Sequence, residues 1–309
     1  MEEQNFNIET ILKLSDQLFR SESASDAVTL LSTFLEEKDN PHAWLKLARA
    51  YMILGEEVVA RAILRNVIFK INKPHVLYLI AARVPYCKPL ILEDRKLIYF
   101  NIPKCGSSTL KDTILLAEGA GRHGEMSHFR ASVYEKIISF KDLETQYADY
   151  QTIMVVRHPR DRLRSYWTKN LAEKESLTKE ACGRQTFYGL NPRPSYNEIL
   201  ANFARYRSVF LDFRHHTDSI VGYAGQQASR IKHIFPLSEI SKAMDMLQLP
   251  ETVEQERPWN MQSGRKFDFG TCDLELEKEV INNFYQRELS AYFGENPARD
   301  GADDIPSET

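Results

Sequence analysis

The sequence has few cysteines and no long apolar run, and both absences exclude classes of protein. Its four cysteines are widely spaced with no Cys-x-x-Cys pair, which argues against a zinc site. Two disulfides could be drawn on paper, but reduced thiols are the simpler interpretation. No stretch approaches the ~18 apolar residues that a membrane-spanning helix needs, and the acidic, polar start is unlike a signal peptide. The net charge of −3 offers no general basic surface for nucleic acid or membranes.

The remaining composition is that of a soluble globular protein. The chain has 309 residues, of which 43% are hydrophobic and 27% charged. This length is enough for one large domain or two ordinary ones, with a core that needs neither disulfides nor metals.

The first 85 residues predict helices with an internal repeat. When the sequence is shifted by 33 positions, apolar and proline residues coincide, and residues 77–84 continue the series. The coincident pairs are Ile11 with Trp44, Leu14 with Leu47, Leu18 with Tyr51, Ala27 with Ala60, Leu31 with Leu64, and Pro41 with Pro74.

The second copy resembles a tetratricopeptide repeat. It has Trp44-x-x-Leu47, Tyr51 and Ala60-x-x-x-Leu64, so that large apolar residues share one helical face and an alanine allows close packing. The period is one residue short, and alanine and leucine replace a usual glycine and aromatic. The resemblance implies degenerate repeats, and the alternative is an ordinary helical hairpin extension.

The chain beyond residue 90 predicts an α/β domain. Strands are expected at 96–102, 152–156 and 230–235, and helices at 108–118, 129–140, 159–174 and 274–292. Strands that alternate with helices indicate a central parallel sheet. We therefore expect three segments: helical repeats at 1–85, the α/β domain at 90–294, and a disordered acidic tail at 295–309.

The first chemical motif is the string Ile102-Pro-Lys104-Cys105-Gly106-Ser107-Ser108-Thr109 between a strand and a helix. Unpaired N–H groups at a helix start form a natural anion site. Gly106 allows the backbone close to the anion, Lys104 adds a charge, and the hydroxyls add donors. A capped helix after a turn is the alternative. The string is not a Walker A loop, because its lysine precedes the glycine.

This string resembles the 5′-phosphosulfate loop of sulfotransferases that use 3′-phosphoadenylyl sulfate (PAPS), especially the carbohydrate branch. The resemblance implies a P-loop-like three-layer fold with a central parallel sheet. It also implies that Lys104 touches the bridging oxygen and the transferring group, with backbone contacts from Gly106 to Thr109. Members of this family often carry a membrane anchor, and its absence here predicts a cytoplasmic enzyme.

The second motif is Arg157-His158-Pro159, which follows a predicted strand, with Ser165 in the next helix. It resembles the family's 3′-phosphate element, in which histidine here replaces the usual aspartate. Arginine at a strand end presents a rigid fork to phosphate, and serine adds a hydroxyl. The resemblance makes Arg157 and Ser165 the phosphate ligands. At least two of the arginines at 160, 162 and 164 are expected to be solvated or paired with acids.

A third string, residues 257–266, resembles the Asn-x-Ser loop that closes over the nucleotide in carbohydrate sulfotransferases. By that resemblance Ser263, Gly264, Arg265 and Lys266 cover the 3′-phosphate side. The asparagine and serine are one residue further apart here than in the family. A basic surface loop is the alternative.

Transfer needs a general base to take the acceptor's proton. The family's carbohydrate members often place a histidine, sometimes a glutamate, between the two nucleotide motifs. His128 is the favoured base, with His123 and Glu125 as alternatives. His215 and His216 could line the acceptor cleft.

The resemblance predicts an enzyme that transfers a sulfuryl group from PAPS to a hydroxyl on a sugar or glycoconjugate, with PAP as product and no metal. Residues 1–85 would recruit an acceptor or protein partner or self-associate. The rivals are an ATP-dependent kinase of related architecture and a catalytically dead scaffold. Nucleic acid is not expected as a partner.

Overall fold

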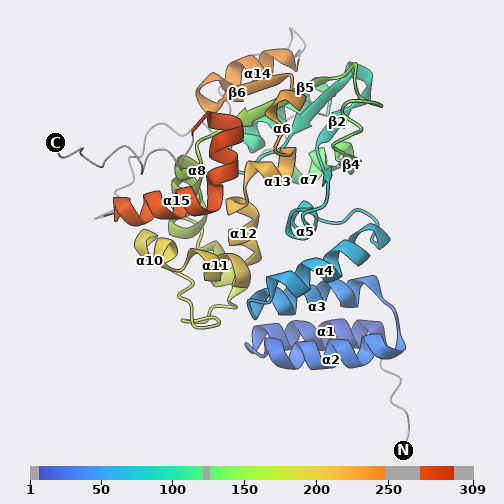
Figure 1. Ribbon diagram of the computed structural model, residues 1–309, viewed down its shortest axis with the longest axis vertical. Coiled ribbons are helices and arrows are strands. Elements are labelled where there is room, and N and C mark those ends of the chain that lie inside the picture. Colours follow the sequence, from blue (N-terminus) through green and yellow to red (C-terminus); the bar gives the residue numbers. More distant parts are fainter. Residues whose placement is uncertain (1–6, 121–125, 248–271, 296–309) are drawn as a thin grey trace, which may run out of the picture. The chain divides into compact units, whose positions relative to one another are not determined.

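The computed structural model describes residues 7–120, 126–247 and 272–295 (Figure 1). Contacts divide the chain into two compact units, and each contains two stretches of sequence. The first unit combines residues 1–84 with 169–215, and the second combines 85–168 with 216–309. Residues 169–215 are therefore an insertion into the second unit that folds with the N-terminal helices. The expected boundaries at 85, 90 and 295 remain predictions, and the tail from 296 lies outside the described residues.

The described part of the first unit contains helices and no β-strand. Its elements are α1 (Ile8–Arg20), α2 (Ala24–Glu37), α3 (Pro41–Ile53), α4 (Glu57–Val67), α5 (Val76–Ala82), α9 (Ser176–Glu180), α10 (Tyr196–Ala201), α11 (Phe203–Val209) and α12 (Leu211–Thr217), the last of which ends in the second unit. Each of the first four helices packs on the next one, and α1 also packs on α3. Asparagines cap two of them: the side chains of Asn7 and Asn40 accept backbone N–H groups of α1 and α3.

The 33-residue spacing of the sequence recurs in the helix boundaries. The starts of α1 and α3 are 33 residues apart, at Ile8 and Pro41, and α2 and α4 start at Ala24 and Glu57. The paired small and apolar positions of the second helices are buried in both copies, as Ala27 and Leu31 and again as Ala60 and Leu64. Whether these hairpins are true tetratricopeptide repeats stays a prediction.

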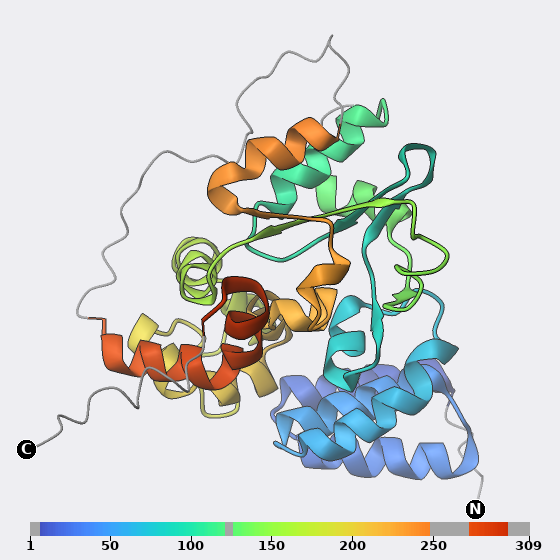
Figure 2. The ribbon, with the colours of Figure 1, turned by 45° about the horizontal axis from the view of Figure 1, so that its top comes forward.

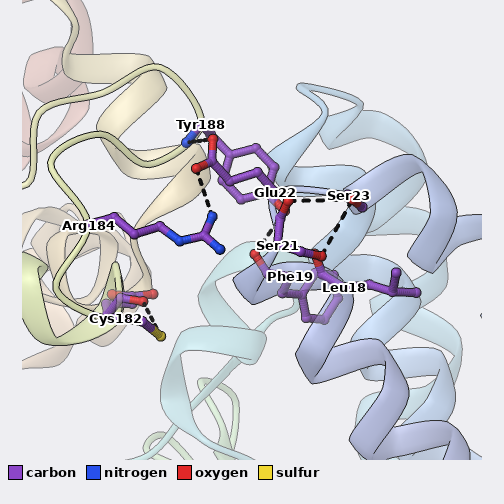
Figure 3. Close-up of polar contacts among 9 residues, drawn as sticks. Leu18, Phe19, Ser21, Glu22, Ser23, Cys182, Arg184 and Tyr188 are labelled. Carbon is purple, nitrogen blue, oxygen red and sulfur yellow. Dashed lines mark hydrogen bonds and ion pairs between the residues drawn. The ribbon is translucent and has the colours of Figure 1, made fainter.

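The insertion is tied to the first helical hairpin through Glu22, which lies in the turn between α1 and α2 (Figure 3). The Glu22 carboxylate lies 3.0 Å from the Arg184 guanidinium and accepts the backbone N–H of Tyr188 at 2.7 Å. The Tyr188 hydroxyl donates to the backbone carbonyl of Phe19 at 3.3 Å. Glu22 has φ +64°, so the turn holds its carboxylate at the cost of a left-handed backbone.

The second unit contains the predicted α/β arrangement. Its elements are β1 (Tyr86–Cys87), β2 (Leu90–Leu92), β3 (Leu97–Phe100), α6 (Ser107–Ala117), α7 (Ser127–Ala131), β4 (Ile138–Ser139), β5 (Gln151–Val156), α8 (Pro159–Tyr166), α13 (Ile220–Ala224), β6 (His233–Pro236), α14 (Ile240–Met246) and α15 (Leu274–Glu288). Single π-helical turns follow α8 and α15, at Trp167–Ala172 and Leu289–Phe293. Among the described residues no helix is both long and apolar enough to cross a membrane.

The main sheet has the strand order β2-β3-β5-β6. Strands β3, β5 and β6 are mutually parallel, which confirms the three predicted strands, and β2 adds an antiparallel edge that the sequence did not indicate. All of β3 and all but the first residue of β5 are buried, as expected for parallel strands covered on both faces. In Figure 2, α6 and α14 lie on one side of this sheet and α13 and α15 on the other.

The helix expected at 129–140 is wrong. Helix α7 ends at Ala131, a single 3₁₀ turn follows, and the chain then becomes extended and pairs as β4 with β1. Backbone N–H groups of Lys136 and Phe140 donate to the carbonyls of Pro89 and Pro85. This pairing with a distant segment outweighs the helical pattern of the local sequence.

Replacing Glu22 with alanine is expected to loosen the insertion locally. The change removes the acceptor of the Tyr188 N–H and the partner of Arg184, which is worth about 1 kcal/mol at a partly exposed site. Hydrogen exchange of the Tyr188 amide should therefore accelerate about fivefold. Glu37→Ala, at an exposed position of α2, is the control and should leave that amide unchanged. Equal exchange of the Tyr188 amide in both variants would contradict a stabilising contact between Glu22 and the insertion.

Candidate active site

Parallel pairing brings the two nucleotide motifs to one edge of the sheet. In the register of β3 and β5, Phe100 lies opposite Met154, so the loops after both strands leave at the same carboxyl edge. Strand β6 ends at that edge too, with Pro236 opposite Val156. Ligands of open α/β sheets bind outside the carboxyl ends of strands. The candidate site therefore lies where the sequence places Lys104 and Arg157.

The loop before α6 has the geometry of an anion cradle. Lys104 and Gly106 both have left-handed backbone, with φ of +63° and +74°, and α6 begins directly after them at Ser107. No side chain of the described residues caps this helix start, so its first N–H groups point out of the helix end. A Cβ on Gly106 would lie 2.5 Å from Cδ1 of Ile240 in α14. The backbone conformation thus favours glycine, and any Cβ at this position would also have to displace the end of the Ile240 side chain.

The hydroxyls of this loop differ in their surroundings. Ser107 and Thr109 are buried, whereas Ser108 is half-buried and its Oγ lies 2.8 Å from Nε2 of His128. Any contact of Ser107 or Thr109 with an anion is therefore expected through the backbone N–H groups.

Cys105 of the first motif lies close to the start of the second motif. Its side chain is fully buried, and its sulfur lies beside the backbone N–H of Arg157, directly after β5. Burial raises the pKa of the thiol to about 12, so Cys105 is a neutral packing residue at ordinary pH. The thiol thus lies where the anion cradle and the second motif approach each other.

Arg157 and Ser165 occupy half-exposed positions at the start and end of the second motif. Arg157 follows β5, and its guanidinium has no carboxylate partner among the residues that the structure describes. His158, which stands where the family usually has an aspartate, caps α8, because its Nδ1 accepts the N–H of Arg160 at 3.2 Å. The proposed phosphate contacts of Arg157 and Ser165 stay predictions.

The other arginines of α8 pair with acids, as expected from the sequence. Arg162 pairs with Glu288, and Arg164 pairs with Glu277 through two nitrogens. Arg160 is exposed and lies 3.8 Å from Asp161. Arg157 thus differs from the other three arginines of this segment, because each of those pairs with a carboxylate of the protein.

His128 is held by a chain of contacts between α6 and α7. The Ser127 hydroxyl, buried at the first residue of α7, donates to Asp112 of α6 at 2.8 Å. The next residue, His128, then meets Ser108 one turn earlier on α6. The role of His128 as the base stays a prediction, and the helix that carries it is shorter than the sequence predicted.

The imidazole of His128 is strongly biased toward its neutral form. Desolvation by the surrounding protein lowers its pKa to about 4, although part of the ring stays exposed. The nearby charges of Lys111, His216 and Lys104 also lower the pKa, and Glu135 opposes them. A neutral histidine at pH 7 has a lone pair that can accept a proton.

Lys111 and Glu135 also influence the pKa of His128, and neither was identified from the sequence. The Lys111 side chain is buried and lies 3.4 Å from Glu135, which also pairs with Lys88 at 3.0 Å. The available signal was spacing, because Lys111 is three residues after Ser108 and shares its helical face. Glu135 gave no such signal, because it reaches the site from the segment between α7 and β4.

Several predicted residues lie outside the described part of the chain. These are the alternative bases His123 and Glu125, and Ser263, Gly264, Arg265 and Lys266 of the third string. Within the described ranges, no cluster of three histidine, cysteine or acidic side chains is arranged to hold a metal ion.

Gly106→Ala is expected to damage the anion cradle. A left-handed alanine costs about 1–2 kcal/mol, and its Cβ must displace Ile240. Gly119→Ala is the matched control, because Gly119 has φ +71° beyond the other end of α6 and open space around its Cβ position. Urea unfolding should show similar losses in both variants, whereas binding of PAP, followed by calorimetry, should weaken only in Gly106→Ala. Equal binding by the two variants would refute a cradle at Gly106.

Lys111→Met is expected to raise the pKa of His128 above about 4. The change removes the nearest cation and leaves the opposing charge of Glu135. NMR titration of the His128 ring measures this directly, and Lys13→Met, an exposed position of α1, serves as the control. An unchanged or lower pKa in Lys111→Met would show that lysine does not tune the histidine.

A comparison with protein families matches residues 89–259 to the sulfotransferase family. The match covers more than half of the 309 residues and includes both strand-ending motifs, the cradle before α6 and the Arg157 segment. No curated protein and no solved structure compared with the chain gives a match. The match, with which the parallel α/β sheet of the second unit agrees, leads to one conclusion: the chain belongs to the sulfotransferase family.

Proposed function

We propose that this protein transfers a sulfuryl group from PAPS to an acceptor hydroxyl on a carbohydrate or glycoconjugate. The observation that carries the proposal is the meeting of the two motifs. Cys105 of the cradle contacts the backbone of Arg157, and both loops leave the same edge of parallel strands. PAPS is the donor generally used in the family. The residues at this edge fit a nucleotide with an anionic group at each end.

The cradle suits the sulfated 5′ end of the donor. The first N–H groups of α6, the positive end of its dipole and the Lys104 ammonium would together meet the charge of the phosphosulfate. As the sulfur–oxygen bond to the phosphate breaks, negative charge grows on the leaving phosphate oxygen. Groups fixed in advance around that oxygen would stabilise the charge without rearrangement.

The second motif suits the 3′-phosphate. Arg157 offers a guanidinium fork without a carboxylate competitor among the described residues, and Ser165 lies on the helix that follows. This pair would distinguish PAP and PAPS from nucleotides that lack a 3′-phosphate. An ATP-dependent kinase would have no use for such a pair.

His128 is the proposed base. Its Nε2 lies 2.8 Å from the Ser108 hydroxyl, which places the ring beside the cradle, and its lowered pKa favours the neutral ring at pH 7. The acceptor oxygen would form its bond to sulfur while its proton passes to His128, and PAP would leave. Positioning and charge stabilisation are expected to dominate the rate, as in phosphoryl transfer.

The acceptor class rests on the carbohydrate-branch resemblance of the cradle string. We further propose that residues 1–85 recruit an acceptor or partner. The contact of Glu22 with the insertion shows that this helical unit already binds a segment of its own chain. A partner would therefore use faces other than the turn after α1.

Arg157→Ala is expected to abolish discrimination for the 3′-phosphate. Calorimetry should show that the wild type binds PAP at least tenfold more tightly than AMP, because a charged pair to phosphate contributes about 1.5–3 kcal/mol. Arg157→Ala should bind both nucleotides equally weakly. Arg160→Ala, which removes an exposed arginine of the same segment, should bind as the wild type does.

Other results of the binding experiment would favour a kinase or a scaffold. Equal binding of AMP and PAP by the wild type, or a preference for ATP, would overturn the proposal in favour of a kinase. Absence of nucleotide binding would favour a scaffold. If PAP binds, turnover of PAPS with sugar acceptors should disappear in Lys104→Ala and fall strongly in His128→Asn.

A further inference from the structure

The second unit contains a buried ion pair that the proposed reaction does not use. Arg162 of α8 and Glu288 at the end of α15 are 2% and 0% exposed, and Nη2 of the arginine lies 3.1 Å from Oε2 of the glutamate. Figure 2 shows α8 and α15 beside each other, and the two helices are in contact. Burial raises the pKa of Glu288, and the adjacent Arg162 opposes that effect.

The pair also organises the chain between α12 and α13. The same Oε2 of Glu288 accepts the N–H of Ile220 at 2.7 Å, at the start of α13. Arg162 Nη2 donates to the carbonyl of Asp218 at 3.2 Å, and its guanidinium lies 5.6 Å from the ring centre of Tyr285. The Tyr285 hydroxyl donates to Thr217 at 2.6 Å. One charge pair thus fixes α8, α15 and residues 217–220 together.

The pair reaches the anion cradle as well. Arg162 and Glu288 are the two charges that act most strongly on the buried thiol of Cys105, ahead of Arg157. The pair is therefore close enough to Cys105 of the cradle to act on it electrostatically. Its arginine belongs to α8, the helix that carries Ser165 and follows Arg157.

Stability alone is a weak explanation for these charges. Two apolar residues of similar volume usually stabilise a core as well as a buried ion pair does. The arrangement even leaves Nε and Nη1 of Arg162 without a hydrogen-bond partner among the described residues. An ion pair, unlike an apolar contact, is directional, and on a helix of eight residues it fixes the rotation about the helix axis.

From this geometry we infer that Arg162 and Glu288 are positioning residues for recognition of the nucleotide's 3′-phosphate. They set the rotation of α8, and hence the direction of Ser165, relative to the cradle at Cys105. The inference rests on the proposed function, because it concerns the same nucleotide site. Neither residue is expected to touch the nucleotide.

The test is the double variant Arg162→Met with Glu288→Leu, which keeps the volume of the cluster and removes both charges. Its thermal unfolding should match or exceed that of the wild type. Its affinity for PAP, measured by calorimetry, should fall about tenfold, while its weaker affinity for AMP stays constant. Arg162→Lys keeps the charge without the fork and should lie between wild type and the double variant.

The matched control is the second ion pair between the same two helices. Arg164→Met with Glu277→Leu removes a partly exposed pair and should leave the ratio of PAP to AMP affinity unchanged. An equal loss in both double variants would show general loosening of α8 and would overturn the inference. Glu288→Gln, which keeps an acceptor for Ile220, provides the same readout if the double variant does not fold.

The failures of the two proposals are distinguishable. If the wild type prefers PAP and the folded double variant binds PAP as the wild type does, the pair is only structural and the proposed function stands. If the wild type does not distinguish PAP from AMP, the proposed function fails first and the positioning role fails with it.

Discussion

The parallel pairing of β3 with β5 is the constraint on which the site depends. Two segments far apart in the chain end at one edge because their strands share a direction and a register. The contacts at that edge depend on this pairing. Gly106 lets α14 pack against the cradle, and Cys105 contacts the start of the second motif. A shift of register by one residue would turn every side chain of a strand to the opposite face of the sheet and separate the two loops.

The charges around this edge form a second level of organisation. Lys104, Lys111 and His216 all lower the pKa of His128, and Glu135 opposes them. Such a concentration of positive charge suits an anionic ligand and, at the same time, keeps the histidine unprotonated. Binding of an anion would offset part of this field and make His128 more basic when the ligand is in place. The site would therefore gain proton affinity together with its ligand.

Local patterns predicted the elements that depend on neighbouring residues. The strands ending near Phe100 and Val156, the helix from Ser107 and the family itself followed from short strings of sequence. The features that were not predicted depend on contacts between residues far apart in the sequence. The segment after Ala131 became extended because it pairs with residues 85–90, and Glu135 and Glu288 reach their partners from distant segments. No sequence spacing encodes such encounters, so only the folded chain shows them.

The composition of the helical unit from residues 1–84 and 169–215 has a consequence for synthesis. The N-terminal helices leave the ribosome first, but Glu22 can bind Arg184 and Tyr188 only after those residues have been synthesised. At about 5–20 residues per second, the intervening strands and helices delay that contact by on the order of ten seconds. During this interval the first hairpins lack part of their packing surface. Completion of the amino-terminal unit is thus coupled to translation of the α/β unit, and a ribosome that stalls between them would leave an incomplete unit exposed to proteases and chaperones.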